Sequence, residues 1–141
     1  MDLLSRNLKQ MNKENTMDLQ TNALSPFIEN MSKLYKATHP NGSKMYGRLI
    51  VEEYHEWIDE WGGTPEDFKE ICDLIWVSIM YCIEKGYPIV EGMEELTKEF
   101  KSKFYDKEGN YCPTFREDGK LLKGSGFKKA DFKQFLISNN I

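Results

Sequence analysis

The sequence is poor in the side chains that disulfides and zinc sites require. It has only two His and three Cys among 141 residues, and Cys72, Cys82 and Cys112 form no CxxC pair. An odd, widely spaced set of cysteines is typical of reduced packing thiols and argues against a disulfide framework or a zinc site. The thiols therefore indicate a reducing compartment, and we expect a cytoplasmic protein.

Long apolar runs are also absent. No run reaches the roughly 18 residues that are needed to span a bilayer, and residues 1–6 form neither a signal-type apolar stretch nor a cleavage site. We therefore expect a soluble protein that is neither secreted nor bound to a membrane. With three Trp, seven Tyr and eight Phe, the chain has enough aromatic material for one folded domain.

The two parts of the chain differ in charge. Residues 1–97 carry 9 basic and 17 acidic side chains, whereas residues 98–141 carry 10 basic and 6 acidic ones. An acidic body could hold a metal while a basic tail binds phosphate oxygens, although an ordinary solvated surface explains the same asymmetry. The net acidity argues against stable nucleic-acid binding.

Turn and capping signals predict four helices. Ser25 and Pro26 are typical of an N-cap followed by the first helical position. Thr64 and Pro65, followed by acids, give a second start signal, and Gly86 is typical of the residue after a helix end. The expected helices cover residues 26–37, 44–61, 65–85 and 88–104.

The remainder of the chain has no helical pattern. Residues 1–24 are polar and are expected to form an N-terminal arm, with residues 25–141 as the folded domain. Residues 117–120, between two short apolar pairs, predict a hairpin turn. We therefore expect an all-α fold of four helices with a C-terminal hairpin and extended tail.

The second expected helix carries its acids on one face. At about 100° per residue they fall within an arc of roughly 120°, opposite the apolar side chains. Like charges four residues apart cost a few tenths of a kcal/mol each, and no Lys or Arg is interleaved with them. A bound cation would turn this repulsion into a ligand set, and a plain solvated acidic face is the alternative. The acids are Glu52, Glu53, Glu56, Asp59 and Glu60.

The third expected helix places carboxylates in apolar surroundings. From residue 71 to 83 apolar residues cover nearly the whole circumference, which is typical of a buried helix. Because an unpaired buried charge is very costly, Asp73 needs either a metal or a structural partner such as Arg, Tyr or a backbone donor. Glu70 precedes it at i,i+3 spacing, and two antiparallel helices could bring both residues to Glu53 and Glu56. Oxygen ligands alone favour Mg²⁺ or Mn²⁺ over zinc.

Together these clusters resemble the signature of the all-α nucleoside triphosphate pyrophosphohydrolases, which include the MazG-like proteins. That signature is a helix with E-E-x-x-E, a loop, and a helix with E-x-x-D followed by an apolar run. Residues 52–56 and 70–77 match it. Residues 48–50 and 102–104 also look like the family, and the stretch 106–124 resembles the tail of small phage and bacterial MazG-like proteins.

The resemblance implies a Mg²⁺-dependent hydrolysis between the α- and β-phosphates of a (deoxy)nucleoside triphosphate, giving the monophosphate and pyrophosphate. It implies a homodimer or homotetramer, because family members use helices from more than one subunit. It also implies that Glu52 and Glu53 are catalytic, with Glu52 assisting the ligands or taking a proton from the attacking water. The implied metal ligands are Glu53, Glu56, Glu70 and Asp73. The candidate substrate contacts are Arg48, Trp57, Lys101, Lys103 and Lys123, with core packing as the alternative for Trp57.

Two other interpretations stay open. The same fold and reaction could serve another substrate, such as phosphoribosyl-ATP or dUTP alone. A helical interaction module, whose acidic face binds a basic protein, would have no enzyme activity. Metal dependence separates the enzymes from the module, because a protein-binding face needs no divalent ion.

Overall fold

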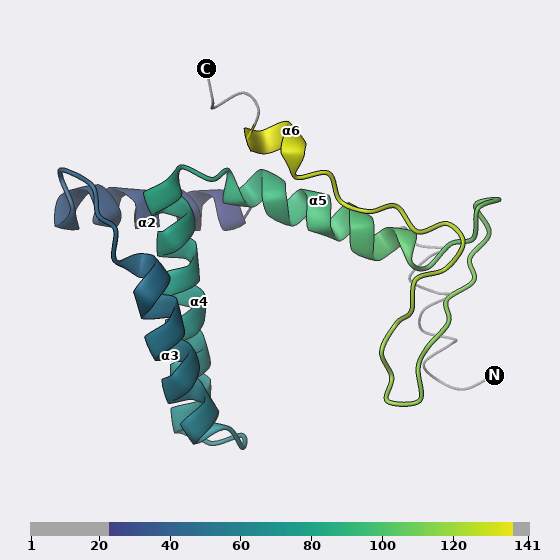
Figure 1. The fold of residues 1–141 in the computed structure, drawn as a ribbon, viewed down its shortest axis with the longest axis horizontal. Coiled ribbons are helices and arrows are strands. Elements are labelled where there is room, and N and C mark those ends of the chain that lie inside the picture. Colours follow the sequence, from purple (N-terminus) through teal and green to yellow (C-terminus); the bar gives the residue numbers. More distant parts are fainter. Residues whose placement is uncertain (1–22, 137–141) are drawn as a thin grey trace. The chain divides into compact units, whose positions relative to one another are not determined.

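The computed structural model describes residues 23–136, and within this range the fold is helical (Figure 1). The predicted all-α class is confirmed. The predicted N-terminal arm, residues 1–24, lies almost entirely outside the described residues. None of the described helices is long and apolar enough to cross a membrane. The helices are α2 (Leu24–Thr38), α3 (Tyr46–Glu60), α4 (Pro65–Lys85), α5 (Ile89–Ser102) and α6 (Lys133–Leu136).

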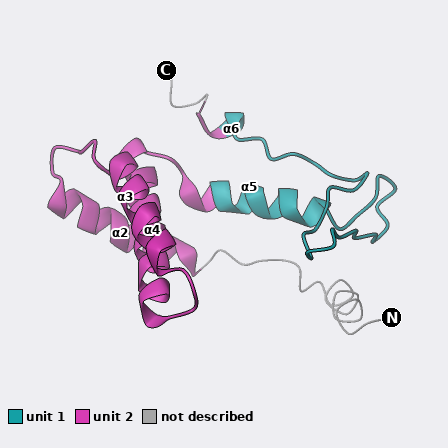
Figure 2. Cartoon of the chain, turned by 60° about the horizontal axis from the view of Figure 1, so that its bottom comes forward, with its two compact units in different colours: residues 1–22, 92–134 teal, residues 23–91, 135–141 magenta. Residues whose placement is uncertain are grey.

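The chain divides into two compact units (Figure 2). Of the described residues, unit 2 contains 23–91 and 135–136, and therefore holds α2, α3 and α4. Unit 1 contains residues 92–134, most of α5 and the segment that follows it. Each unit is described by itself.

Unit 2 is built around the antiparallel pair of α3 and α4, with α2 packed against α4 (Figure 1). The loop between α3 and α4 is short, so consecutive helices lie side by side. The buried core lies toward the end of the pair where α4 ends and α3 begins, and it draws on all three helices. Its members are Met31, Tyr35, Tyr46, Val77, Ile79 and Met80.

The boundaries of α4 are those that the sequence predicts. Thr64 is the N-cap, and its hydroxyl accepts a hydrogen bond from the Asp67 amide at 3.1 Å. Pro65 occupies the first turn, where a missing N–H costs nothing. Gly86 ends the helix in the left-handed conformation, with φ of 72°, which only glycine adopts without strain.

The predicted start of α2 is wrong by two residues. The helix begins at Leu24, and Ala23 is its N-cap without a side-chain hydrogen bond. Ser25 therefore lies inside the first turn rather than capping it. The reason is that Pro26 fits any position of the first turn, where backbone N–H groups have no intrahelical acceptor. A proline locates a helix start only to within about two residues for that reason.

A carboxylate from the end of α4 caps the start of α3. The Glu84 Oε2 atom accepts hydrogen bonds from the Tyr46 amide at 3.2 Å and from the Ser43 hydroxyl at 3.0 Å. The Ser43 hydroxyl also lies 2.9 Å from the Tyr35 hydroxyl. The Met45 N-cap position provides no side-chain cap of its own, so this network supplies it and ties all three helices together.

The segment that follows α5 in unit 1 forms two turns. The predicted hairpin turn is confirmed: the Arg116 amide donates to the Lys120 carbonyl at 2.7 Å, and Gly119 has φ of 91°. An antiparallel bridge joins Phe115 to Leu121. A second bridge, between Tyr105 and Tyr111, was not predicted. The sequence around it contains Gly109, which adopts φ of 85° and allows the tight turn.

The prediction that α4 is buried on all sides is wrong for the single chain. The side that turns away from α3 exposes Phe68 (72%), Ile75 (54%) and Cys72. Among the described helices, only α3 and α2 make extensive contacts with α4, and two neighbours cannot cover a helix that is apolar all round. An apolar stripe of α4 is thus left exposed within the described chain.

The apolar side of α3 is exposed as well. Tyr54, Ile58 and Trp61 are each more than two-fifths exposed, and Trp61 reaches 79%. Of the acids on this helix, Glu53 faces α4, whereas the others are exposed. Within one chain, the α3–α4 pair therefore has carboxylates between its helices and apolar side chains on its surface.

Candidate metal centre

The loop between α3 and α4 is held by one carboxylate. Asp67, in the first turn of α4, accepts a hydrogen bond from the Trp57 indole N–H at 2.8 Å. Its other oxygen accepts the backbone amides of Gly63 at 2.8 Å and Gly62 at 3.3 Å. These donors, the two amides first, lower the pKa of Asp67 because they stabilise its charged form. The clamp fixes α3 against α4 about one turn from the acids described next.

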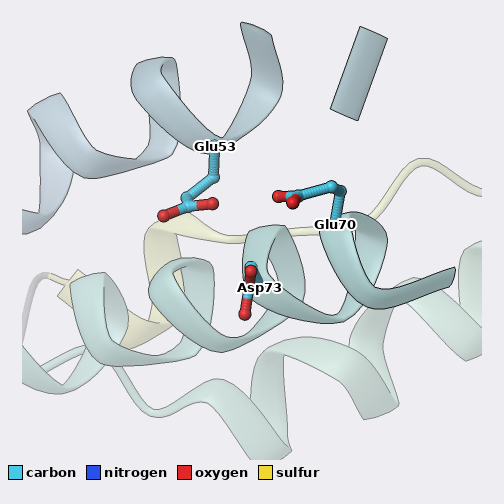
Figure 3. Close-up of side chains that lie close together, drawn as sticks. All are labelled: Glu53, Glu70 and Asp73. Atoms are coloured by element: carbon cyan, nitrogen blue, oxygen red, sulfur yellow. The ribbon is translucent and has the colours of Figure 1, made fainter. Parts of the chain in front are cut away.

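Three carboxylates converge between α3 and α4. Glu53 comes from α3, and Glu70 and Asp73 come from α4 at i,i+3 spacing, so both lie on the helix face that meets α3. One oxygen from each residue lies within 4.8 Å of one from each of the others. Figure 3 shows Glu53 and Glu70 turned toward one another from facing helices, with Asp73 below them. We call these residues the three-carboxylate cluster.

Two oxygens of the cluster lack partners. The Oε2 atoms of Glu53 and Glu70 are buried from solvent and accept no hydrogen bond from any described residue. A buried acceptor without a donor costs free energy comparable to a lost hydrogen bond, and more if it is charged. A cation between the two helices would satisfy both oxygens at once.

The cluster also shifts the ionisation of Glu53. Burial is the largest cause that raises the pKa of this residue above its usual value of 4.5. A hydrogen bond with Glu56 and the negative charges of Glu56, Asp73 and Glu70 raise it further. Without a cation, the cheapest way to relieve this repulsion is to protonate one member of the group.

Lys69 supplies the one positive charge near the cluster among the described residues. Its ammonium pairs with Asp73 one turn further along α4, and lies 3.7 Å from Glu70. These carboxylates raise the pKa of Lys69, Asp73 first. The Lys69 side chain is 67% exposed, so it can leave the cluster without disturbing the core. The sequence analysis missed this residue, although Lys69 and Asp73 have the i,i+4 spacing of a helical ion pair.

The structure brings together three of the four predicted metal ligands. Glu56 is exposed and shares a side-chain hydrogen bond with Glu53, yet it lies outside the three-carboxylate cluster. Glu52, the predicted catalytic residue, is exposed and also lies outside it. Arg48 is exposed near the start of α3. Trp57 is half-buried, and its indole N–H is used by the Asp67 clamp.

The predicted lysine contacts all lie in unit 1. The ammonium of Lys103 is 5.3 Å from the ring centre of Phe100, and that of Lys123 is 4.8 Å from the ring centre of Phe127. Lys101 lines a cavity at the end of α5. The three-carboxylate cluster belongs to unit 2.

The donors of the three-carboxylate cluster fit a hard divalent cation. They are carboxylate oxygens only, which Mg²⁺ and Mn²⁺ prefer and which select against zinc and copper. The unpartnered oxygens of Glu53 and Glu70 are available as ligands. Asp73 would be a third ligand if Lys69 left its carboxylate.

Comparison of the chain with protein-family models, with curated proteins and with solved structures found no match. The similarity to the pyrophosphohydrolases thus rests on the two acidic motifs and on the tail sequence. What the fold adds is the convergence of Glu53, Glu70 and Asp73 from those two motifs.

Proposed function

We propose that the protein is a Mg²⁺-dependent nucleoside triphosphate pyrophosphohydrolase with a MazG-like helical core. The observation that supports it best is the meeting of Glu53 with Glu70 and Asp73 between two antiparallel helices. Residues from the E-E-x-x-E and E-x-x-D motifs are the ones that meet, as a metal site would require. The buried, unpartnered oxygens of Glu53 and Glu70 add a physical need for a cation.

Each residue of the cluster has a defined part in this proposal. Glu53, Glu70 and Asp73 hold the metal, and Glu56 assists through its contact with Glu53. When bound, Mg²⁺ neutralises charge on the phosphate oxygens and lowers the pKa of a water. Glu52 is exposed at the rim of the acidic face and accepts the proton of the attacking water. The products are the nucleoside monophosphate and pyrophosphate.

We also propose that the active form is a homodimer or homotetramer. The support is the apolar surface of the α3–α4 pair, where Trp61, Phe68 and Ile75 are all more than half exposed. A soluble chain rarely leaves such side chains uncovered along two adjacent helices. A second copy of the pair would bury them in a larger helical bundle.

A product assay tests the function. The purified protein is incubated with each ribo- and deoxyribonucleoside triphosphate, and with phosphoribosyl-ATP, in Mg²⁺ or in EDTA. We expect monophosphate and pyrophosphate from at least one substrate, in Mg²⁺ only. Glu53→Gln and Asp73→Asn should each lower turnover by at least about a hundredfold. Mutation of residues that merely support metal ligands can already lower metal affinity or activity by about that factor.

The outcome of this assay also separates the alternatives. Turnover of dUTP or phosphoribosyl-ATP alone would keep the fold and the reaction and narrow the substrate. Diphosphate and orthophosphate as products would contradict the assigned bond. No turnover of any substrate would contradict the enzyme and favour a protein-binding role for the acidic face.

A further inference from the structure

Unit 1 contains a cavity of about 640 Å³. The last turns of α5, the turn at residues 105–109 and the segment 125–128 form its walls. None of the cluster carboxylates lines it. Its volume is within the range of about 300–1,000 Å³ that small-molecule pockets occupy.

Hydrogen bonds tie the walls of this cavity together. The Ser102 hydroxyl on α5 accepts the Lys128 amide at 2.8 Å. The Ser125 hydroxyl accepts the Lys107 amide at 3.0 Å. The Gly126 amide donates to the Tyr105 carbonyl at 3.2 Å. Each of the three bonds joins residues at least 18 positions apart in sequence, so the cavity is a product of the fold and not of one loop.

Gly126 allows two of the walls to approach one another. A Cβ atom on this residue would lie 2.4 Å from the Tyr105 carbonyl oxygen and 2.5 Å from that of Asp106. Both distances are far below van der Waals contact, and the atoms belong to the backbone. A side chain at this position would therefore push segment 125–128 away from the turn at 105–109.

The cavity has an excess of positive charge. Lys98, Lys101, Lys107 and Lys128 line it from all three walls, and Lys98 also pairs with Glu95 at 3.9 Å. Its one acid, Asp106, accepts the backbone amides of Asn110 at 2.9 Å and Glu108 at 3.0 Å. These bonds lower the pKa of Asp106 and engage its carboxylate within its own turn. Among the described residues, neither Lys107 nor Lys128 takes part in an ion pair.

From this arrangement we propose that the cavity binds a phosphate-bearing small molecule. Its phosphate oxygens contact Lys107 and Lys128, which bind phosphate as point charges. Tyr105 and Phe127 line the same cavity and provide aromatic surface for the remainder of the ligand. The inference rests on unit 1 alone and holds whether or not the three-carboxylate cluster hydrolyses nucleotides.

Isothermal titration of the full chain in EDTA tests the inference, with inorganic tripolyphosphate and ATP as the probes. EDTA removes any metal-bridged binding to the carboxylates of unit 2, so the assay is independent of hydrolysis. We expect both probes to bind. If ATP binds more tightly than tripolyphosphate, the cavity also recognises the nucleoside. If both bind equally, it recognises only the phosphate chain.

Matched variants locate the binding. The double variant K107Q/K128Q should weaken binding of both probes by at least about tenfold, because two charge-assisted contacts are lost. K107R/K128R should retain it. K120Q/K133Q removes the same charge from exposed positions of unit 1 outside the cavity and should bind as the wild type does.

Three results would overturn the inference. The first is that neither probe binds the wild type in EDTA. The second is that K107Q/K128Q binds the probes as tightly as the wild type does. The third is that K120Q/K133Q loses as much affinity as K107Q/K128Q, which would reveal only general charge attraction. Far-ultraviolet circular dichroism of every variant ensures that only folded proteins are compared.

Discussion

The ammonium group of Lys69 pairs with the carboxylate of Asp73 one turn further along α4, and it lies 3.7 Å from Glu70. A lysine in this position and a divalent cation would compete for the same oxygens. The lysine is mostly exposed, so its pair with Asp73 is weak compared with a metal bound by several carboxylates. Lys69 thus serves as a counter-ion for the metal-free cluster.

Replacing this counter-ion should strengthen metal binding. We expect Lys69→Met to raise the Mg²⁺ affinity about two- to fivefold, the size of an exposed ion pair, because the competitor for Asp73 is gone. Titration calorimetry of Mg²⁺ measures the change. Lys33→Met, at an exposed position on α2, is the matched control and should leave the affinity unchanged. Weaker Mg²⁺ binding in Lys69→Met would contradict competition.

The raised pKa of Glu53 has a consequence for stability in EDTA. The folded chain holds a proton on this residue at pH values where the unfolded chain has lost it. The contribution of Glu53 to stability must therefore fall as the pH rises from about 4.5, the usual glutamate value, through the raised pKa. Thermal melts of the wild type and Glu53→Gln across this range measure the effect.

The comparison between these two proteins isolates Glu53 from other titrating groups. The melting temperature of the wild type should fall relative to that of Glu53→Gln as the pH rises. Asp67 and Asp106, whose pKa values are lowered, make stability rise with pH instead. They do so equally in both proteins and therefore cancel in the comparison. If the difference in melting temperature between the two proteins is the same at every pH, the neighbours of Glu53 do not raise its pKa.

Cys72 reports on the apolar stripe of α4. Within the single chain this thiol is exposed between Phe68 and Ile75. If a second copy covers the stripe, Cys72 should react with iodoacetamide at least about tenfold more slowly than Cys112, which is exposed in unit 1. Peptide mass spectrometry gives both rates in one sample. Equal rates, together with a monomeric mass by light scattering, would refute the oligomer.

Local signals explain what could be predicted from the sequence. The start and end of α4 follow from Thr64, Pro65 and Gly86, each of which acts on the backbone within a few residues of its own position. The hairpin turn at residues 117–120 is equally local. The convergence of Glu53 with Glu70 and Asp73 could be predicted because the two acidic motifs lie on consecutive helices. The short loop between these helices makes them pack antiparallel.

The features that were missed depend on contacts between distant residues. Nothing local reveals that the Trp57 indole binds Asp67, because that contact needs the loop to fold first. Burial of α4 was predicted from composition, yet composition cannot say whether its neighbours belong to the same chain. The cavity of unit 1 needs Ser102 to meet Lys128, which are 26 positions apart.

Thermal melts of the wild type, Asp73→Asn and Asp59→Asn, in Mg²⁺ and in EDTA, test the metal centre itself. Asp59 is an exposed acid of α3 outside the three-carboxylate cluster, so Asp59→Asn controls for the lost charge. We expect Mg²⁺ to stabilise the wild type and Asp59→Asn by about 2–3 kcal/mol at a hundredfold excess over its dissociation constant. Asp73→Asn should stay folded and respond little to Mg²⁺. An equal loss of stability in Asp73→Asn with Mg²⁺ and with EDTA, and no effect of Mg²⁺ on the wild type, would contradict the metal site.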